Sequence, residues 1–320
     1  MKTYHVLELS GFKQEHKQKL PAFVKCTYAT PATVTLTQMQ QVDIVIGRPP
    51  IELLKQSPNV KWLQLDTAGS EIYAKEEVLP KGCILTNATG SFGLAISEYL
   101  LCTILMLMRN MNLYIRNQEK GLWQVEGPIS SIYGSTFLIV GLGDLGMEFA
   151  KKVKLLGGKS IGIKRHVDKE LEYIDELYTL QDIEKLLPRA DVVVLALPNT
   201  KETARCFHKE YFEFMKKSAI FVNVGRGNAV YTEDVLHAVK ENEIAGAILD
   251  VCDVEPIPSS HPIWKEENII ITPHISGTFQ LPETYERFVD IVIQNLHAYD
   301  RGEELRNVVD LSLGYRTYHK

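Results

Sequence analysis

The stretch TFLIVGLGDLGMEFAKKVKLLG, residues 136–157, decides the fold of this chain. An apolar run leads directly into Gly141, Gly143 and Gly146, and a helix-like pattern follows. Glycines in the spacing G-x-G-x-x-G, between a strand and a helix, permit a tight turn and bring backbone N–H groups close to a pyrophosphate. The stretch therefore predicts a dinucleotide-binding loop. The alternative is a Gly-rich turn without a ligand, because the carboxylate of Asp144 repels a diphosphate unless it turns outward.

Apolar segments typical of strands lie on both sides of this loop. Continuous apolar strands separated by helix-length spacers indicate parallel sheets covered by helices on both faces. We therefore expect an α/β fold with two doubly wound parallel-sheet domains: a flavodoxin-like, discontinuous substrate domain of residues 1–97 and 283–320, and a Rossmann cofactor domain of residues 98–282. The segments are HVLEL (5–9), VDIVIG (42–47), KWLQL (61–65), CILTN (83–87), KSIGIKR (159–165), DVVVLALP (191–198), AIFVNVG (219–225), GAILDV (246–251) and NIIIT (268–272).

Two further segments predict helices that connect or complete these domains. Residues 93–118 suit one long helix between the two series of strands. Residues 282–300 form an amphipathic helix, with Pro282 in its first turn and apolar residues at spacings of three and four. This helix and a strand at 305–310 are expected to pack on the N-terminal domain. The apolar positions of the last helix are Tyr285, Phe288, Val289, Val292 and Leu296.

Composition excludes several classes of function. The formal net charge of -5 is spread along 320 residues without a Lys/Arg-rich block, so no nucleic-acid partner is expected. The N-terminus lacks the apolar segment of a secretion signal, which indicates a cytoplasmic protein. The apolar run 99–108 is shorter than the roughly 20 residues that span a bilayer, so we expect a buried helix and no membrane partner.

The cysteines indicate neither a disulfide framework nor a metal site. They are odd in number, widely scattered and without a C-x-x-C pair. We expect no metal and interpret them as reduced thiols of the core. They are Cys26, Cys83, Cys102, Cys206 and Cys252.

The residues after the second strand of the cofactor domain bear on the choice of dinucleotide. An NAD site normally places an acidic residue there for the ribose 2′-hydroxyl. Here Lys164, Arg165 and His166 occupy the strand end, and their charge and hydrogen bonds suit a 2′-phosphate. NADP is therefore favoured over NAD. In the alternative, Asp168 reaches the ribose and the cofactor is NAD.

Three residues with chemically active side chains follow three successive strands. Arg226 follows FVNVG, Glu255 lies in LDVCDVEP, and His274 lies in TPHISG. Ligands of open α/β sheets bind at the carboxyl ends of the strands, so we expect these residues to meet. Singly they also fit a solvated turn, a loop dipeptide and a capping or buried histidine.

These blocks, together with WLQLDTAGSE, ILTNATGSFGLAISEYLL and GLGDLG, closely resemble the D-isomer-specific 2-hydroxyacid dehydrogenase family over nearly the whole chain. The resemblance implies that Arg226 binds the carboxylate and carbonyl of a 2-keto acid, that His274 is the acid/base and that Glu255 is its partner. The chemistry agrees, because an imidazolium donates a proton to the carbonyl oxygen on which charge develops. A carboxylate behind the imidazole holds its tautomer and favours the protonated form. In this hypothesis Gly225 and Gly227 let the backbone turn sharply, so that Arg226 faces a cleft.

The resemblance also implies the remaining site residues. Asp250 would accept a hydrogen bond from the nicotinamide carboxamide, Ala68 and Gly69 would offer N–H groups to the substrate carboxylate, and Pro198 would line the adenine side. Their alternatives are a helix cap, a tight turn and a strand terminator. The full cofactor set is Gly141, Gly143, Asp144, Leu145, Gly146, Lys164, Arg165, His166, Leu197, Pro198, Thr203, Val224, Gly225, Arg226, Asp250, His274 and Gly277.

The sequence thus predicts an NAD(P)-dependent oxidoreductase that reduces small 2-keto acids, such as glyoxylate or hydroxypyruvate, to D-2-hydroxy acids. The alternative is a dinucleotide-sensing, corepressor-like protein with little turnover. Cys252 stands where the family usually has an aromatic residue, so we expect a pocket wall that is wider or different in polarity. A homodimer is expected from the family, through residues 94–135. Apolar residues in a loop that is expected to be exposed support a dimer: Trp123, Ile129, Ile132 and Tyr133. The alternative is that they pack on the chain's own core.

Overall fold

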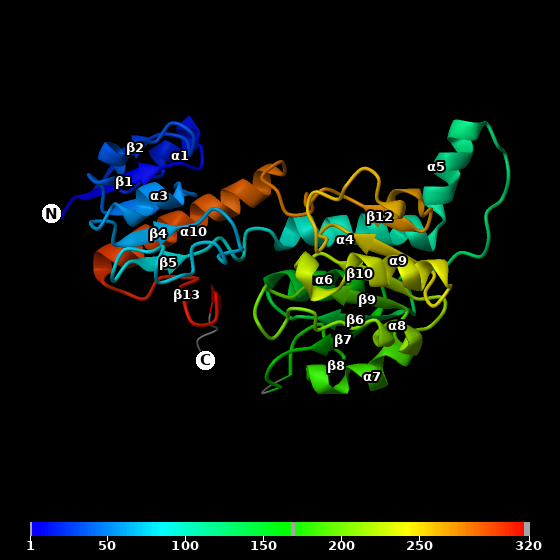
Figure 1. Cartoon of the computed structure of the whole chain (residues 1–320). Coiled ribbons are helices and arrows are strands. Elements are labelled where there is room, and N and C mark those ends of the chain that lie inside the picture. Colours follow the sequence, from blue (N-terminus) through cyan, green and yellow to red (C-terminus); the bar gives the residue numbers. More distant parts are fainter. Residues whose placement is uncertain (1, 168–169, 317–320) are drawn as a thin grey trace. The chain divides into compact units, whose positions relative to one another are not determined.

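The computed structural model describes residues 2–167 and 170–316 and divides into two compact units (Figure 1). The first unit takes in the chain up to Phe92 and again from Phe279, and the second unit is Gly93–Thr278. The predicted boundaries at 97/98 and 282/283 lie five and four residues further along the chain. The first unit is thus built from two separate segments of sequence.

The first unit contains a parallel sheet of five strands in the order β2-β1-β3-β4-β5. This order is that of flavodoxin-like doubly wound folds, as predicted. The strands are β1 (Tyr4–Glu8), β2 (Val24–Tyr28), β3 (Ile44–Ile46), β4 (Trp62–Gln64) and β5 (Ile84–Thr86).

Helices cover both faces of this sheet because side chains alternate along each strand. Val6 and Ile44 point to the face covered by α10, where Phe288 is fully buried. Leu7 and Val45 point to the opposite face, which carries α2 and α3. The predicted helix 282–300 is confirmed as α10, with Pro282 in its first turn. The helices are α1 (Gln14–Gln18), α2 (Leu36–Met39), α3 (Ile51–Lys55) and α10 (Pro282–Arg301).

The C-terminal residues pack on the first unit as predicted. Val309 is buried in the same core as Leu63 and Leu85, and Val308 forms an antiparallel bridge to Thr86. The expected strand is short: β13 (Val309–Asp310), which pairs with β14 (Tyr315–Arg316).

The second unit contains a parallel sheet of seven strands in the order β12-β11-β10-β9-β6-β7-β8. The order reverses between β6 and β9, and dinucleotides bind at such a switch point, outside the carboxyl ends of the strands. The strands are β6 (Thr136–Val140), β7 (Lys159–Ile163), β8 (Glu176–Tyr178), β9 (Val192–Leu195), β10 (Ile220–Asn223), β11 (Gly246–Leu249) and β12 (Ile269–Ile271).

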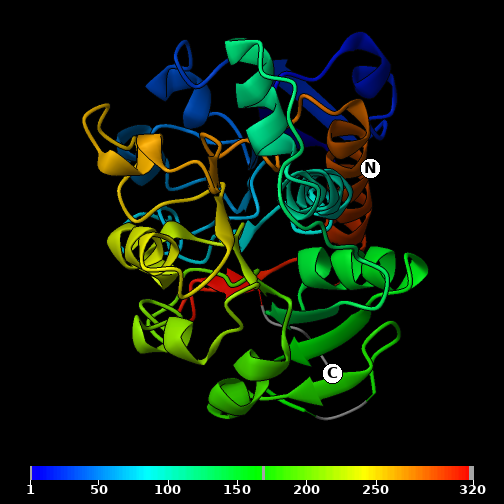
Figure 2. The ribbon, with the colours of Figure 1, turned by 90° about the vertical axis from the view of Figure 1, so that its right-hand side faces the viewer.

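Helices also cover both faces of the second sheet. Phe137 and Ile139 of β6 pack with α4 and α6, which lie side by side; Figure 2 views α4 end-on beside the green α6. Leu138 and Val140 pack on the opposite face with α7, α8 and α9. The helices are α4 (Gly93–Met108), α5 (Met111–Lys120), α6 (Asp144–Leu155), α7 (Ile183–Leu186), α8 (Glu210–Phe214) and α9 (Thr232–Lys240), with short 3-10 turns at Leu180–Asp182, Leu187–Arg189, Gly227–Ala229 and Pro262–Lys265.

The prediction of one helix over 93–118 is wrong. Asn110 has a left-handed φ of 55°, and α4 and α5 on its two sides are bent by 65°. Asparagine adopts this conformation more readily than most residues, so it ends α4 without a glycine. In the described residues no single helix is long and apolar enough to cross a membrane, and α4 with α5 passes that test only as this bent pair.

Two expectations about buried residues are partly wrong. Cys83, Cys206 and Cys252 are buried thiols as predicted, but Cys102 is exposed on α4 and Cys26 is half-buried. Ile132 was expected in the exposed loop, yet it is buried against α4 and α6. For Ile132 the alternative of packing on the chain's own core therefore holds.

Candidate active site

The glycines of the loop after β6 are required by close backbone contacts. Gly141 has φ +104°, and a Cβ added there would lie 2.6 Å from the carbonyl oxygen of Ala196. A Cβ at Gly146 would lie 2.1 Å from the carbonyl oxygen of Gly141. Gly143 precedes α6, whose first N–H groups have no partner within the helix. This cradle at the switch point fits the pyrophosphate of a dinucleotide.

Asp144 turns toward the beginning of α4. A Cβ added at Gly93 would lie 2.9 Å from Asp144 Oδ2, so the carboxylate faces that glycine. A carboxylate at a helix N-terminus is stabilised by the helix dipole. Repulsion between this carboxylate and a diphosphate at the loop is therefore a weak objection. Leu145 follows Asp144 in the first turn of α6.

The end of β7 carries the predicted basic residues. The N–H of Lys164 donates to the carbonyl oxygen of Tyr178 at 3.0 Å, which extends the pairing with β8. The guanidinium of Arg165 pairs with Glu202 at 2.6 Å, a partner that the sequence did not indicate. His166 is exposed. The alternative residue for the ribose, Asp168, lies outside the described residues.

The loop after β9 is closed on itself beside the glycine loop. Thr203 Oγ1 donates to the carbonyl oxygen of Pro198 at 2.5 Å and accepts the N–H of Thr200 at 2.9 Å. Leu197 lies against both Gly141 and Gly225, where an added Cβ would be 3.2 Å and 2.6 Å from its atoms. The predicted cofactor residues of β6 and β9 therefore meet at the switch point.

The two glycines around Arg226 are needed for a reason other than the predicted sharp turn. Neither has a left-handed φ. A Cβ at Gly227 would lie 1.8 Å from the carbonyl oxygen of Cys252, and one at Gly225 would lie 2.6 Å from the N atom of Leu197. The expectation about backbone turning is thus corrected: the glycines let the loop after β10 touch the loops after β9 and β11.

Asn223, which sequence reasoning did not assign, fixes the backbone around Arg226. Its Oδ1 accepts the N–H of Gly225 at 3.2 Å, and its Nδ2 donates to the carbonyl oxygen of Arg226 at 3.0 Å. Arg226 itself is extended and half-buried, and its Nη1 donates to the carbonyl oxygen of Gly225 at 2.9 Å. Val224, two residues before Arg226, is buried. The strand-ending asparagine was visible in VNVGRGNAV, but its two contacts depend on the folded loop.

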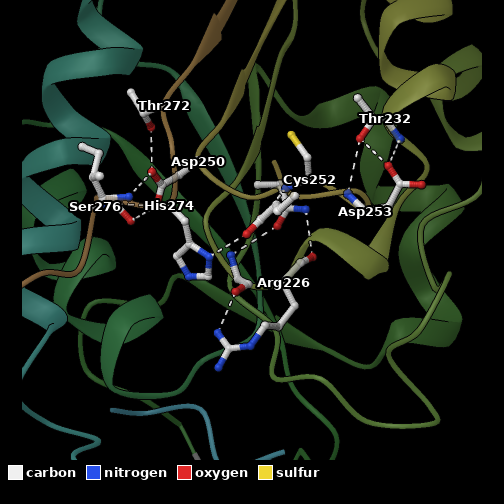
Figure 3. Close-up of polar contacts among 12 residues, drawn as sticks. Arg226, Thr232, Asp250, Cys252, Asp253, Thr272, His274 and Ser276 are labelled. Carbon is white, nitrogen blue, oxygen red and sulfur yellow. Dashed lines mark hydrogen bonds and ion pairs between the residues drawn. The ribbon is translucent and has the colours of Figure 1, made fainter. Parts of the chain in front are cut away.

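Glu255 and His274 form a carboxylate–imidazole pair. Glu255 Oε2 lies 3.0 Å from His274 Nδ1, and Glu255 Oε1 accepts the N–H of Cys252 at 2.9 Å. The bond to Nδ1 leaves Nε2 directed outward, and about half of the imidazole is exposed (54%). Figure 3 shows His274 and Arg226 projecting to the same side of the strand ends. The predicted convergence of these residues is therefore present.

His274 sits in a strained, tightly bonded loop. It has a left-handed φ of 54°, which is costly for a residue other than glycine and is common at functional sites. Its N–H donates to the carbonyl oxygen of Asp250 at 2.9 Å. The buried carboxylate of Asp250 accepts four hydrogen bonds from the same loop (Figure 3): from Thr272 Oγ1, the N–H of Ile275, and the N–H and Oγ of Ser276.

These four donors fill the acceptor positions of a carboxylate, which has about four. The predicted bond from Asp250 to the nicotinamide carboxamide stays a prediction, while the observed bonds give Asp250 a structural role in holding the His274 loop. Gly277 lies in the turn that follows. Cys252 is buried beside this region, and burial raises the pKa of its thiol to about 11, so the thiol is protonated at neutral pH.

The residues predicted to contact substrate from the N-terminal segment lie in the first unit, after β4. The carbonyl oxygen of Ala68 accepts a bond from Asn87 at 2.8 Å, and that of Gly69 accepts one from Thr67 Oγ1 at 2.8 Å. These bonds fix the orientation of the peptides. At the same edge Arg48 pairs with the buried Asp66 at 2.9 Å, and burial raises the pKa of that carboxyl.

Comparison with known proteins identifies the family. Residues 101–276 match the family model described as "D-isomer specific 2-hydroxyacid dehydrogenase, NAD binding domain". The chain belongs to this dehydrogenase family. It is also 32% identical over 270 residues to a glyoxylate reductase of Korarchaeum cryptofilum, covering 81% of this chain and 79% of that protein. The predicted resemblance is confirmed.

Solved structures of family members have the same fold. A D-isomer specific 2-hydroxyacid dehydrogenase family protein from Aeromonas salmonicida has a TM-score of 0.87 and 31% identity, over 97% of this chain and all of that one. A D-isomer specific 2-hydroxyacid dehydrogenase from Xanthobacter autotrophicus, in complex with NADPH and MES, has a TM-score of 0.83 and 25% identity, over 98% and 100%. The predictions of the fold class and of an NAD(P)-dependent oxidoreductase of this family are confirmed.

Proposed function

We propose that this dehydrogenase reduces small 2-keto acids, with glyoxylate and hydroxypyruvate as first candidates, to D-2-hydroxy acids with NADPH. The observation that carries the proposal is the pairing of Glu255 with His274 Nδ1 at 3.0 Å, at the strand end next to that of Arg226. An imidazole held by a carboxylate, together with a guanidinium, is the set that a reaction at a 2-keto acid requires. The glyoxylate reductase of Korarchaeum cryptofilum supports a small substrate.

Arg226 is proposed to bind the substrate carboxylate and the carbonyl oxygen. A guanidinium binds planar oxygen pairs through two parallel hydrogen bonds, so it also orients the carbonyl group. The hydrogen bonds of Asn223 to the backbone on both sides limit the movement of this loop. N–H groups of Ala68 and Gly69 are proposed as further carboxylate contacts.

His274 is proposed to donate a proton from Nε2 to the carbonyl oxygen as negative charge develops there. Glu255 accepts a hydrogen bond from Nδ1, which fixes the orientation of the ring and leaves Nε2 for the substrate. Proton donation by a positioned acid contributes about 10²–10⁴-fold to such rates. In the reverse direction the neutral imidazole removes the hydroxyl proton.

The loop of Gly141, Gly143 and Gly146 and the N-terminus of α6 are proposed to hold the pyrophosphate. The bound nicotinamide supplies the hydride. NADP is favoured over NAD because Lys164, Arg165 and His166 stand at the end of β7, where a 2′-phosphate needs cations. The NADPH complex of the Xanthobacter autotrophicus dehydrogenase supports this preference.

The test is oxidation of NADPH and of NADH, followed by absorbance, with glyoxylate, hydroxypyruvate, pyruvate, phenylpyruvate and branched 2-keto acids. We expect turnover with a small keto acid and a lower KM for NADPH. Tight cofactor binding without turnover across the panel would contradict the proposal and favour a dinucleotide sensor.

A homodimer is proposed through α5 and the loop that follows it. Trp123, Val125 and Tyr133 are 80% exposed or more, and Ile129 is 55% exposed. Monomeric proteins rarely expose so many large apolar side chains together, and such groups mark partner surfaces. Figure 1 shows α5 and this loop projecting from the second unit.

A further inference from the structure

Arg165, the central cation at the end of β7, is joined to a carboxylate from another loop. Arg165 Nη2 lies 2.6 Å from Glu202 Oε2, and the two side chains are 37% and 69% exposed. Glu202 belongs to the loop after β9, between Pro198 and Thr203. The pair thus links the end of β7, where the ribose is proposed to bind, to the loop after β9.

The backbone that carries Glu202 is held in place. Thr203 Oγ1 bonds to the carbonyl oxygen of Pro198 at 2.5 Å, and the N–H of Thr203 donates to Thr200 Oγ1 at 3.2 Å. The carboxylate is therefore presented to Arg165 by an ordered turn. Because it is exposed, it can also contact a ligand at that strand end.

We propose that Glu202 sets the discrimination between the two dinucleotides, and this inference rests on the proposed use of Arg165 for the 2′-phosphate. The strand end at 164–166 lacks the acidic residue that normally accepts a bond from the ribose 2′-hydroxyl. Glu202 supplies a carboxylate to this strand end from the loop after β9, within hydrogen-bonding distance of Arg165. The Arg165–Glu202 pair, and not Arg165 alone, then determines selectivity.

The pair acts in opposite directions on the two cofactors. A 2′-phosphate carries close to two negative charges and competes with Glu202 for the donors of Arg165, and the two anions repel each other. A ribose hydroxyl instead donates a hydrogen bond to the carboxylate. Glu202 consequently weakens NADPH binding and strengthens NADH binding. The preference of the protein for NADPH over NADH is therefore moderate and not strict.

The experiment measures the dissociation constants of NADPH and NADH for the full chain by isothermal titration calorimetry. The variants are Glu202→Gln, Arg165→Gln and the double variant. Glu184→Gln is the matched control, since Glu184 is an exposed glutamate of α7 in the same unit. Glu202→Gln is expected to raise the ratio of NADPH to NADH affinity about three- to tenfold, and Arg165→Gln to lower it by a similar factor. In the Arg165→Gln background, Glu202→Gln is expected to have a smaller effect.

The outcomes separate this inference from the proposed function. If Glu202→Gln changes the ratio by less than about twofold while Arg165→Gln lowers it, the role of Glu202 is overturned and the 2′-phosphate site stands. If Arg165→Gln leaves the ratio unchanged, the proposed NADP preference is overturned and this inference with it. An equal effect of Glu184→Gln would assign the change to net charge and overturn the role of Glu202.

Discussion

The carbonyl oxygen of Asp250 accepts the hydrogen bond of the His274 N–H at 2.9 Å, and the Asp250 carboxylate accepts those of the next two residues, Ile275 and Ser276. One buried residue thereby holds three successive N–H groups of the loop that presents the imidazole. The left-handed φ of His274 is sustained by these bonds. The position of the proposed acid/base thus depends on a residue at the end of β11, the strand next to the β10 that precedes Arg226.

Asp250→Asn is therefore expected to damage both stability and activity. The amide replaces an acceptor oxygen by a donor that faces two other donors, which costs about 1–3 kcal/mol of the free energy of unfolding. Chemical denaturation and kcat measurements test this, with exposed Glu241→Gln as the control. Unchanged stability with weakened cofactor binding would favour the carboxamide role instead.

His274→Gln is expected to lower kcat for keto-acid reduction by about 10²–10⁴-fold, because glutamine keeps the polarity but cannot donate a proton as an acid. The dissociation constant of NADPH should stay close to that of the unmodified protein. Steady-state kinetics and a cofactor titration measure the two effects. Near-normal turnover would remove His274 from the acid/base role.

Arg226→Ala tests the substrate contact. Loss of a paired, charge-assisted contact is expected to lower kcat/KM for the keto acid by about 10²-fold or more, with NADPH binding nearly unchanged. The same kinetic and titration measurements apply. An equal loss of cofactor affinity would assign Arg226 a structural role in the loop after β10.

Gly227→Ala is expected to destabilise the second unit strongly. The new Cβ would lie 1.8 Å from the carbonyl oxygen of Cys252, so the two loops must separate, at a cost of about 3 kcal/mol or more. Gly127→Ala is the control, because its nearest atom is 3.8 Å away. Thermal unfolding of both variants should show a lower Tm for Gly227→Ala alone.

Trp123→Asp tests the proposed dimer. The side chain is fully exposed, so the substitution leaves the fold of one chain intact, while a charge in an apolar interface opposes association. Sedimentation equilibrium is expected to give a dimer for the unmodified chain and a weaker one for the variant. Exposed Gln181→Asp, in the turn Leu180–Asp182 and outside the proposed interface, controls for the same change of charge. A monomeric unmodified chain would contradict the proposal.

The sequence predicts the parts of the site that follow local rules. The glycine spacing at 141–146 predicts the loop between β6 and α6, because the glycines and the adjoining helix are neighbours in sequence. The rule that ligands collect at strand ends predicts the convergence of Arg226, Glu255 and His274. Apolar strands of the sheet centres are likewise predictable, since burial on both faces requires a continuous apolar run.

The features that sequence reasoning missed depend on tertiary contacts or on weak local signals. The edge strands β2 and β8 carry exposed or half-buried polar residues, so they lack an apolar pattern. The break at Asn110 arises from one left-handed residue within a helical pattern. The pair of Arg165 and Glu202 joins residues 37 positions apart, and no sequence spacing indicates it.

The helix α10 has a consequence for the synthesis of this protein. It covers one face of the sheet formed by β1, β3 and β4, yet it is translated after the whole second unit. Domains fold as units once their segments have left the ribosome. The continuous Gly93–Thr278 unit is therefore expected to fold first on the ribosome. One apolar face of the N-terminal strands stays uncovered until α10 has left the ribosome.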